Sequence, residues 1–141
     1  MISLQLIDVK KPTFLKSTHL KNCLKELIFC EKKITGDISI VLTTDEYVLK
    51  VNQDFLQHDY YTDIISFDYS TLPIVSGEIF ISVDRVKENA EVAGVDFENE
   101  FIRVVSHGLL HLLGYKDKTA AQAKEMRQEE EACLSLWADL G

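Results

Sequence analysis

The sequence contains few of the residues that interrupt or cross-link a chain. Two prolines and six glycines in 141 residues leave little room for flexible linkers. The three cysteines are an odd number and form no Cys-x-x-Cys pair, so nothing indicates a disulfide framework or a cysteine zinc site. We therefore expect buried, reduced thiols at Cys23, Cys30 and Cys133, which favours a reducing cytoplasm.

Long apolar runs are also absent. No stretch approaches the roughly 18 apolar residues that a membrane span needs, and the first residues, MISLQLID, lack the basic region and apolar run of a signal peptide. The composition, 46% hydrophobic and 27% charged, is typical of a soluble globular protein. We expect a cytoplasmic protein with a single domain over residues 1–141, because this length fits one domain and can bury a sizeable core.

Positive charge is scarce and unevenly distributed. Fifteen Lys and Arg residues against 23 Asp and Glu residues give a net charge of −8, which would repel nucleic acid if it were evenly spread. Residues 1–33, however, carry seven lysines against three acidic residues. This segment is either an ordinary solvated helix face or a local anion-binding face. The lysines of that face would be Lys16, Lys21, Lys25, Lys32 and Lys33.

Hydrophobic periodicity predicts strands and helices in alternation at the start of the chain. Apolar and polar residues alternate over residues 2–6, as in a half-buried edge strand, and apolar residues recur at helical spacing over residues 14–31. Gly36-Asp37 is expected to separate this helix from a buried strand at residues 38–43.

The middle of the chain predicts a second helix and a second pair of strands. Thr43 or Thr44 can cap the helix, which is followed by a polar, aromatic loop at residues 57–63. A short strand at residues 64–67, a turn at residues 73–77 and a strand at residues 78–82 come next, and the two strands can pair as an antiparallel hairpin.

Three helices are expected to complete the chain. Asp84 can cap the first, which Gly94 ends. A stripe of apolar residues predicts the second from about Phe97 to Leu112, and the third covers residues 120–138. Residues 129–131 are three consecutive glutamates, which we interpret as a solvated face without chemistry. This order of elements predicts an α+β or α/β layer domain with a small mixed sheet.

Residues 107–117, HGLLHLLGYKD, carry the sharpest motif. His107 and His111 are four residues apart, so a helix would stack their imidazoles on one face, at the edge of the apolar stripe. A left-handed glycine at position 114 would turn the chain back and let Asp117 close a triangle of ligands. Three protein ligands leave a fourth position for water, as in catalytic zinc sites. The alternative is a histidine pair with a purely structural role.

The same motif argues against a zinc peptidase. Such peptidases place a glutamate, their general base, directly after the first histidine. Here that position is Gly108, which cannot transfer a proton. Glu100 lies seven residues before His107 and is a candidate base or positioning group on the same helix face.

Residues 107–117 resemble the hallmark of the YbeY endoribonucleases, also called rRNA maturation factors, which reads His-Gly-x-Leu-His-Leu-x-Gly-Tyr-Asp-His. Asn52 and the segment TDIISF at residues 62–67 resemble the family's Asn and its Thr-Asp-Val-Leu-Ser-Phe strand, and GEI at residues 77–79 resembles its Gly-Asp-Ile strand. Further similar positions on the last helix are Met126 and Glu129 or Glu130.

The resemblance implies a zincin-like α+β fold, with a small mixed four-stranded sheet, about five helices and a metal site on a C-terminal helix and the following loop. It implies a zinc-dependent single-strand endoribonuclease with one Zn²⁺ per chain. Such an enzyme would act in maturation of the small-subunit rRNA 3′ end and in ribosome quality control. Its partners would be rRNA, the small ribosomal subunit and its proteins.

The motif spacing and the resemblance together lead to a hypothesis about the roles of individual residues. The metal ligands, and through the metal the catalytic residues, would be His107, His111 and Asp117. Contacts to the substrate are expected from a second set, whose members also fit structural roles at a strand start or in a packed loop. That set is Thr62, Asp63, Ser66 and Tyr115, with Lys16, Lys21 and Lys25 steering the RNA backbone.

Three positions depart from the family pattern. The third ligand is usually histidine, and Asp117 replaces it with an oxygen ligand that zinc accepts but that adds negative charge and favours harder metals. Lys116 occupies the position of the family's usual aspartate. Leu56 stands where many members have an arginine, and leucine cannot pair with a phosphate. Another cation replaces it, or His58 does so weakly, or the nuclease activity is diminished. Leu56 and the acidic balance also favour an alternative: a ribosome-assembly factor that binds rRNA or small-subunit proteins, with a structural metal.

Overall fold

A mixed four-stranded sheet forms the centre of the structure, a computed structural model that describes residues 1–140. The strand order is β1-β2-β4-β3. The first three of these are parallel, and β3 is antiparallel to β4. The mixed sheet and the β3–β4 hairpin were both predicted correctly. The strands are β1 (Ile2–Leu6), β2 (Ile34–Thr43), β3 (Ile64–Asp68) and β4 (Ile74–Ser82).

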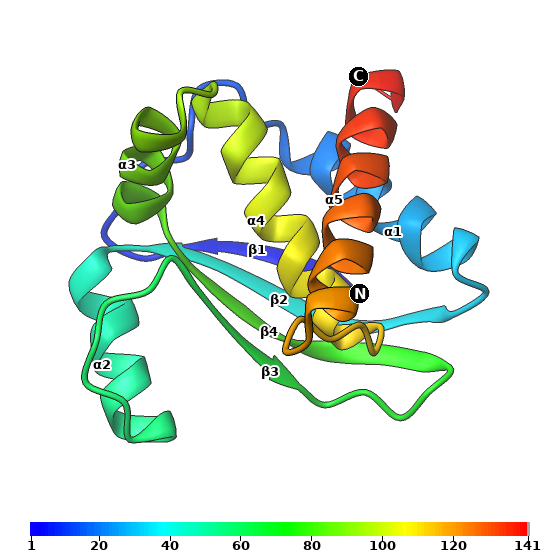
Figure 1. Cartoon of the computed structure of the whole chain (residues 1–141), viewed down its shortest axis with the longest axis horizontal. Coiled ribbons are helices and arrows are strands. Elements are labelled where there is room, and N and C mark those ends of the chain that lie inside the picture. Colours follow the sequence, from blue (N-terminus) through cyan, green and yellow to red (C-terminus); the bar gives the residue numbers. More distant parts are fainter. Residues whose placement is uncertain (141) are drawn as a thin grey trace.

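Five helices cover the two faces of the sheet unequally. Figure 1 shows α2 on one side and the other four helices on the opposite side, with α4 crossing the sheet between α3 and α5. The larger core lies under these four helices, and a smaller cluster lies under α2. The helices are α1 (Ser17–Cys30), α2 (Asp45–Leu56), α3 (Val83–Ala93), α4 (Phe97–Leu112) and α5 (Ala120–Leu140).

Strands β2 and β4 begin earlier in the sequence than predicted, because pairing with neighbouring strands extends them. Gly36 and Asp37 lie within β2, at an irregularity in its register with β4. The turn predicted at residues 73–77 is wrong because β4 begins at Ile74 and lies between two strands. In both places, tertiary pairing outweighs the local preference of glycine and proline for turns.

Side-chain caps start the helices that follow β2 and β4. The Thr44 hydroxyl accepts a hydrogen bond from the backbone N–H of Tyr47 at 3.1 Å, as predicted. Ser82, rather than Asp84, caps α3, because its buried hydroxyl at the end of β4 accepts from the N–H of Arg85 at 3.2 Å. Both loops between strand and helix are therefore tight.

Two glycines allow α4 to lie directly on the sheet. A Cβ atom at Gly108 would lie 2.8 Å from Cδ1 of Ile64 and 3.1 Å from Cγ2 of Ile79. A Cβ atom at Gly77 would lie 2.8 Å from Cδ2 of Leu112. This close approach holds the C-terminal half of α4, which carries both motif histidines, against β3 and β4.

The cysteines differ in exposure. Cys23 and Cys133 are buried, and burial raises the pKa of each thiol to about 11. The expectation of a buried Cys30 was wrong, because this residue ends α1 at the surface. Within residues 1–140, no helix is both long and apolar enough to cross a membrane.

Candidate metal centre and cleft

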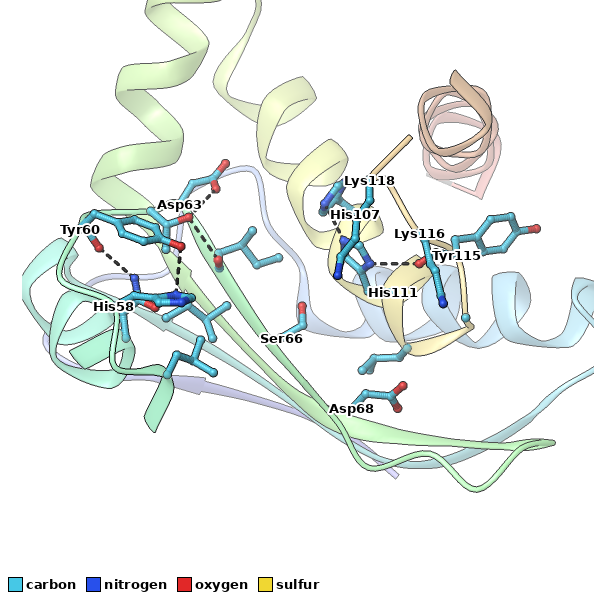
Figure 2. A pocket seen from close by; sticks show the side chains of 17 residues that line it. His58, Tyr60, Asp63, Ser66, Asp68, His107, His111, Tyr115, Lys116 and Lys118 are labelled. Carbon is cyan, nitrogen blue, oxygen red and sulfur yellow. Dashed lines mark hydrogen bonds between the residues drawn. The ribbon is translucent and has the colours of Figure 1, made fainter. Parts of the chain in front are cut away.

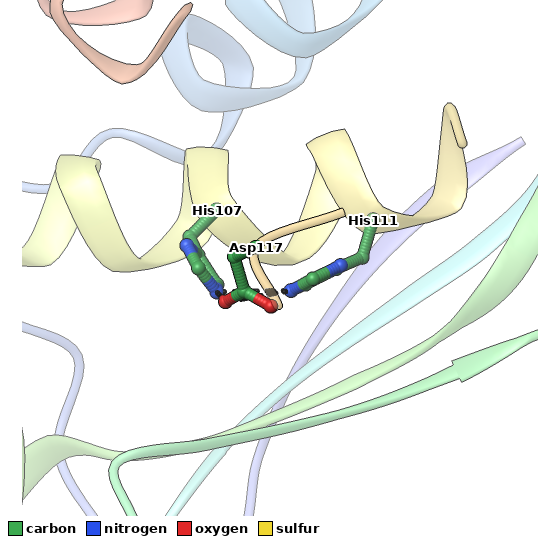
Figure 3. Close-up of side chains that lie close together, drawn as sticks. All are labelled: His107, His111 and Asp117. Carbon is green, nitrogen blue, oxygen red and sulfur yellow. Dashed lines mark hydrogen bonds and ion pairs between the residues drawn. The ribbon is translucent and has the colours of Figure 1, made fainter. Parts of the chain in front are cut away.

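Three side chains of the motif meet at the end of α4. His107 and His111 point toward Asp117, which comes from the loop after the helix (Figure 3). Gly114 has the expected positive φ, 103°, and turns the chain back toward the histidines. The Nε2 atoms of the two histidines are 3.0 Å apart, and the Asp117 Oδ2 atom lies 3.3 Å from that of His107 and 3.6 Å from that of His111.

The hydrogen bonds on the far side of each imidazole define its tautomer. The Nδ1 atom of His107 is 2.7 Å from the Glu130 carboxylate, and that of His111 is 3.1 Å from the backbone carbonyl oxygen of Tyr115. Both oxygens accept, so both Nδ1 atoms donate, and in a neutral imidazole the Nε2 atom then carries a lone pair. When both imidazoles are neutral, two lone pairs and a carboxylate oxygen face one another. Such a group of acceptors repels itself unless a cation lies between its members, so it can hold a metal ion.

The triangle also has suitable dimensions. Bonds of 2.0–2.2 Å in tetrahedral geometry would place the ligand atoms of zinc about 3.3–3.6 Å apart. The two separations from Asp117, 3.3 and 3.6 Å, match this range, and the separation of the two Nε2 atoms, 3.0 Å, is slightly shorter. Two imidazoles and one carboxylate are a donor set that zinc accepts.

Glu130 connects the candidate ligands to the core. Its side chain is 9% exposed and accepts hydrogen bonds from His107 and, at 3.2 Å, from Arg103. Burial opposes ionisation of Glu130, but these hydrogen bonds outweigh it and lower the pKa of the carboxyl. The hydrogen bond to Glu130 in turn raises the pKa of His107 against the opposing effect of burial.

The sequence interpretation of residues 129–131 as a solvated face was wrong for Glu130. This residue lies four positions after Met126 and three before Cys133, both buried, so it belongs to the face of α5 that packs on α4. That spacing was the signal that could have identified it.

An open cleft of about 900 Å³ lies beside the triangle. Figure 2 shows His107 and His111 on one wall, Ser66 on β3 between the walls, and His58 and Tyr60 on the opposite wall. Thr62 and Asp63 also line this cleft. With Tyr115, which also lines it, four of the expected substrate-contacting residues lie at one cavity with the histidines.

Tyr115 lies at the edge of the cleft but uses its hydroxyl elsewhere. The hydroxyl donates a hydrogen bond to Glu31 at 2.9 Å, and Figure 2 shows the ring pointing away from the cavity. Burial, followed by the contact with Glu31, raises the pKa of Tyr115. In this structure Tyr115 therefore connects the loop after α4, which carries Asp117, to the end of α1.

The basic residues of the cleft differ from those expected. Lys21 and Lys25 lie on α1 and Lys16 directly precedes it, and the residues described around the cleft do not include any of the three. The lysines that line it are Lys116 and Lys118, on either side of Asp117. Leu56 also lines the cleft, on the side of α2, and Glu100 does not.

Together, the fold and this site define a class of α+β proteins in which a helix and its following loop present a candidate metal site to an open cleft. The family model described as Endoribonuclease YbeY matches residues 6–138. The chain belongs to the YbeY endoribonuclease family. The predicted enzyme class, a nuclease among the hydrolases, is thereby confirmed.

Individual relatives agree with this assignment. The chain is 50% identical over 107 residues to Endoribonuclease YbeY of Cytophaga hutchinsonii, with 75% of each chain covered. It is 41% identical over 136 residues to Endoribonuclease YbeY of Phocaeicola vulgatus, which covers 96% of this chain and 98% of the relative. The solution structure of a Thermotoga maritima protein is similar with a TM-score of 0.67 and 26% identity, over 99% of this chain and 91% of that one.

Proposed function

We propose that this protein is a zinc-dependent endoribonuclease that cleaves single-stranded RNA, with one zinc ion held by His107, His111 and Asp117. The cluster of three facing acceptors is the observation that carries this proposal. Its substrate would be rRNA in the cytoplasm, at the 3′ end of the small-subunit RNA and in ribosome quality control. The small subunit and its proteins would present this substrate.

Several residues would have distinct roles at this site. Zinc held by His107, His111 and Asp117 would supply Lewis acidity and would lower the pKa of its bound water to about 7. Glu130 and the carbonyl of Tyr115 fix the orientation of the two imidazoles through their Nδ1 atoms. Ser66 and Asp63 line the adjacent cavity, where they would contact the RNA strand.

Lys116 and Lys118 would contact the RNA phosphates in place of the arginine that Leu56 replaces. Both line the cleft and lie next to a ligand in sequence, so their charges would be near the scissile phosphate. Figure 2 shows Lys116 extending from the loop toward the side of the cleft that carries Asp68. Lys16, Lys21 and Lys25 remain candidates for steering more distant parts of a long RNA.

Metal analysis of the purified protein tests the first half of the proposal. We expect about one zinc per chain, which is lost in His111→Ala. Circular dichroism would show that this variant remains folded. The absence of zinc from the wild type, even after zinc is offered at neutral pH, would contradict the proposal.

The second half concerns the role of the metal. A ribosome-assembly factor with a structural metal is the alternative, and it is favoured by Leu56, which offers no charge to a phosphate. For a catalytic metal, Asp117→Ala should abolish cleavage of single-stranded RNA while the fold survives. For a structural metal, Asp117→Ala and the metal-free wild type should both fail to fold, so that stability and function are lost together. Asp139→Ala, an exposed aspartate on α5, is the matched control.

A further inference from the structure

Two aromatic side chains form a stacked pair on the wall of the cleft opposite the ligand triangle. The rings of His58 and Tyr60 are 5.2 Å apart between centroids, with 21° between their planes. The Tyr60 hydroxyl and the His58 Nδ1 atom are joined by a hydrogen bond of 3.1 Å. Both side chains line the cleft and both are exposed, Tyr60 at 55%.

The backbone beneath this pair is held by hydrogen bonds of its own. The side-chain amide of Asn52, which is buried, donates to the carbonyl oxygen of Tyr60 at 2.9 Å. Gln57 ends α2 in the left-handed conformation, and Gln53 donates to the Asp59 carboxylate at 2.6 Å. The aromatic pair is thus oriented without any ligand, which reduces the entropy lost when a ligand binds.

The exposure of these rings distinguishes them from the other aromatic group at the cleft. Tyr115 uses its hydroxyl within the protein and turns its ring away, whereas the His58–Tyr60 pair presents ring surface to the cavity. Flat aromatic surface in a groove that accepts single-stranded nucleic acid is suited to stacking with an unpaired base.

The balanced charges of the cleft also favour binding of a base by stacking. Among the residues described as lining it, two lysines are balanced by Asp63 and Asp68, so the side chains away from the metal give the phosphates little net attraction. Stacking does not depend on charge and contributes about as much for any of the four bases. An acidic protein whose cleft has few cations can bind a strand in this way.

We propose that His58 and Tyr60 form a platform on which one unpaired base of the RNA stacks, with the strand crossing β3 from there to the ligand triangle. This inference rests on the proposed function and adds a binding site for a base to it. Because the platform contacts a base remote from the reacting phosphate, its loss should raise KM and leave kcat nearly unchanged.

The test is a double-mutant cycle between the protein and the RNA. Zinc-loaded wild type, His58→Ala and Tyr60→Ala would each be measured on short single-stranded RNAs that carry one abasic nucleotide, moved position by position. We expect either alanine variant to weaken binding roughly 5- to 150-fold. One abasic position should weaken binding to the wild type by a similar factor and have little effect on either variant.

Two further variants separate stacking from other effects. Tyr60→Trp keeps a large ring and should restore most of the affinity. Tyr69→Ala removes an exposed tyrosine whose hydroxyl bonds Glu78 and which is outside the cleft lining, so its KM should equal that of the wild type.

The outcomes distinguish this inference from the proposed function. If the wild type cleaves RNA and the alanine variants have unchanged KM, or if the abasic and alanine effects simply add, the platform is refuted and the nuclease proposal stands. If the wild type neither binds nor cleaves single-stranded RNA, both are refuted. Coupling at one abasic position, with rescue by Tyr60→Trp, supports the platform.

Discussion

Replacing Glu130 with glutamine removes the charge of the carboxylate that accepts the hydrogen bond of His107, while it keeps the size of the side chain. The amide oxygen can still accept this bond, so the imidazole keeps its orientation but becomes a less basic ligand. Loss of such a partner typically weakens metal binding about 10- to 100-fold, which corresponds to about 1.4–2.8 kcal/mol. The assay is a zinc competition titration against a chelator at pH 8.

A neighbouring residue provides the control. Glu131 also pairs with Arg103, is largely exposed and does not contact a histidine. Glu131→Gln should therefore bind zinc with wild-type affinity. The free energy of unfolding of each variant, measured without metal, shows whether a loss of affinity reflects a loss of fold.

The pH dependence gives a sharper test. Glu130 raises the pKa of His107, and a proton on this residue competes with the metal. In the wild type, zinc affinity should therefore fall as the pH drops through this raised pKa. In Glu130→Gln the pKa is lower, so its affinity falls at lower pH, and its deficit should narrow as the pH is reduced. Equal affinity of the two proteins at pH 8, or a deficit that is the same at every pH, would refute the reasoning.

Three other changes test separate parts of the structure. Gly77→Ala should lower the free energy of unfolding by about 1–3 kcal/mol, measured with denaturant, because its Cβ would clash with the carbonyl oxygen of Phe67. A variant as stable as the wild type, or more stable, would show that β3 and β4 can move apart to accommodate the methyl group without loss of stability. Tyr115→Phe should lower it by about 0.5–1.5 kcal/mol through loss of the hydrogen bond to Glu31 and leave kcat unchanged, whereas a large fall in kcat would give the hydroxyl a role in the reaction. Zinc at a thousand times its Kd should raise the free energy of unfolding by about 4 kcal/mol, and a chelator should reverse this; no change on chelation would argue against specific binding.

The sequence predicted the parts of the site that depend on residues close together in the chain, but not the parts that depend on contacts between distant elements. The ligand triangle depends on residues within one helix turn and one glycine turn, so the spacing from His107 to Asp117 predicted its assembly. Glu130 meets His107 across the contact between α4 and α5, which periodicity along one chain segment does not show. The stacking of His58 on Tyr60 depends on an irregular loop and was likewise not apparent from sequence.

The contact of Gly108 with the sheet also restricts which substitutions this site can accept during evolution. A larger side chain at this position must displace Ile64, which lines the cleft, so even one added methyl group would disturb the surface on which a strand rests. A glutamate there would have to displace the side chains of Ile64 and Ile79, between which the helix lies close to the sheet. The base of a zinc peptidase could therefore be introduced at position 108 only together with a repacking of Ile64 and Ile79, and this repacking would reach the cleft through Ile64.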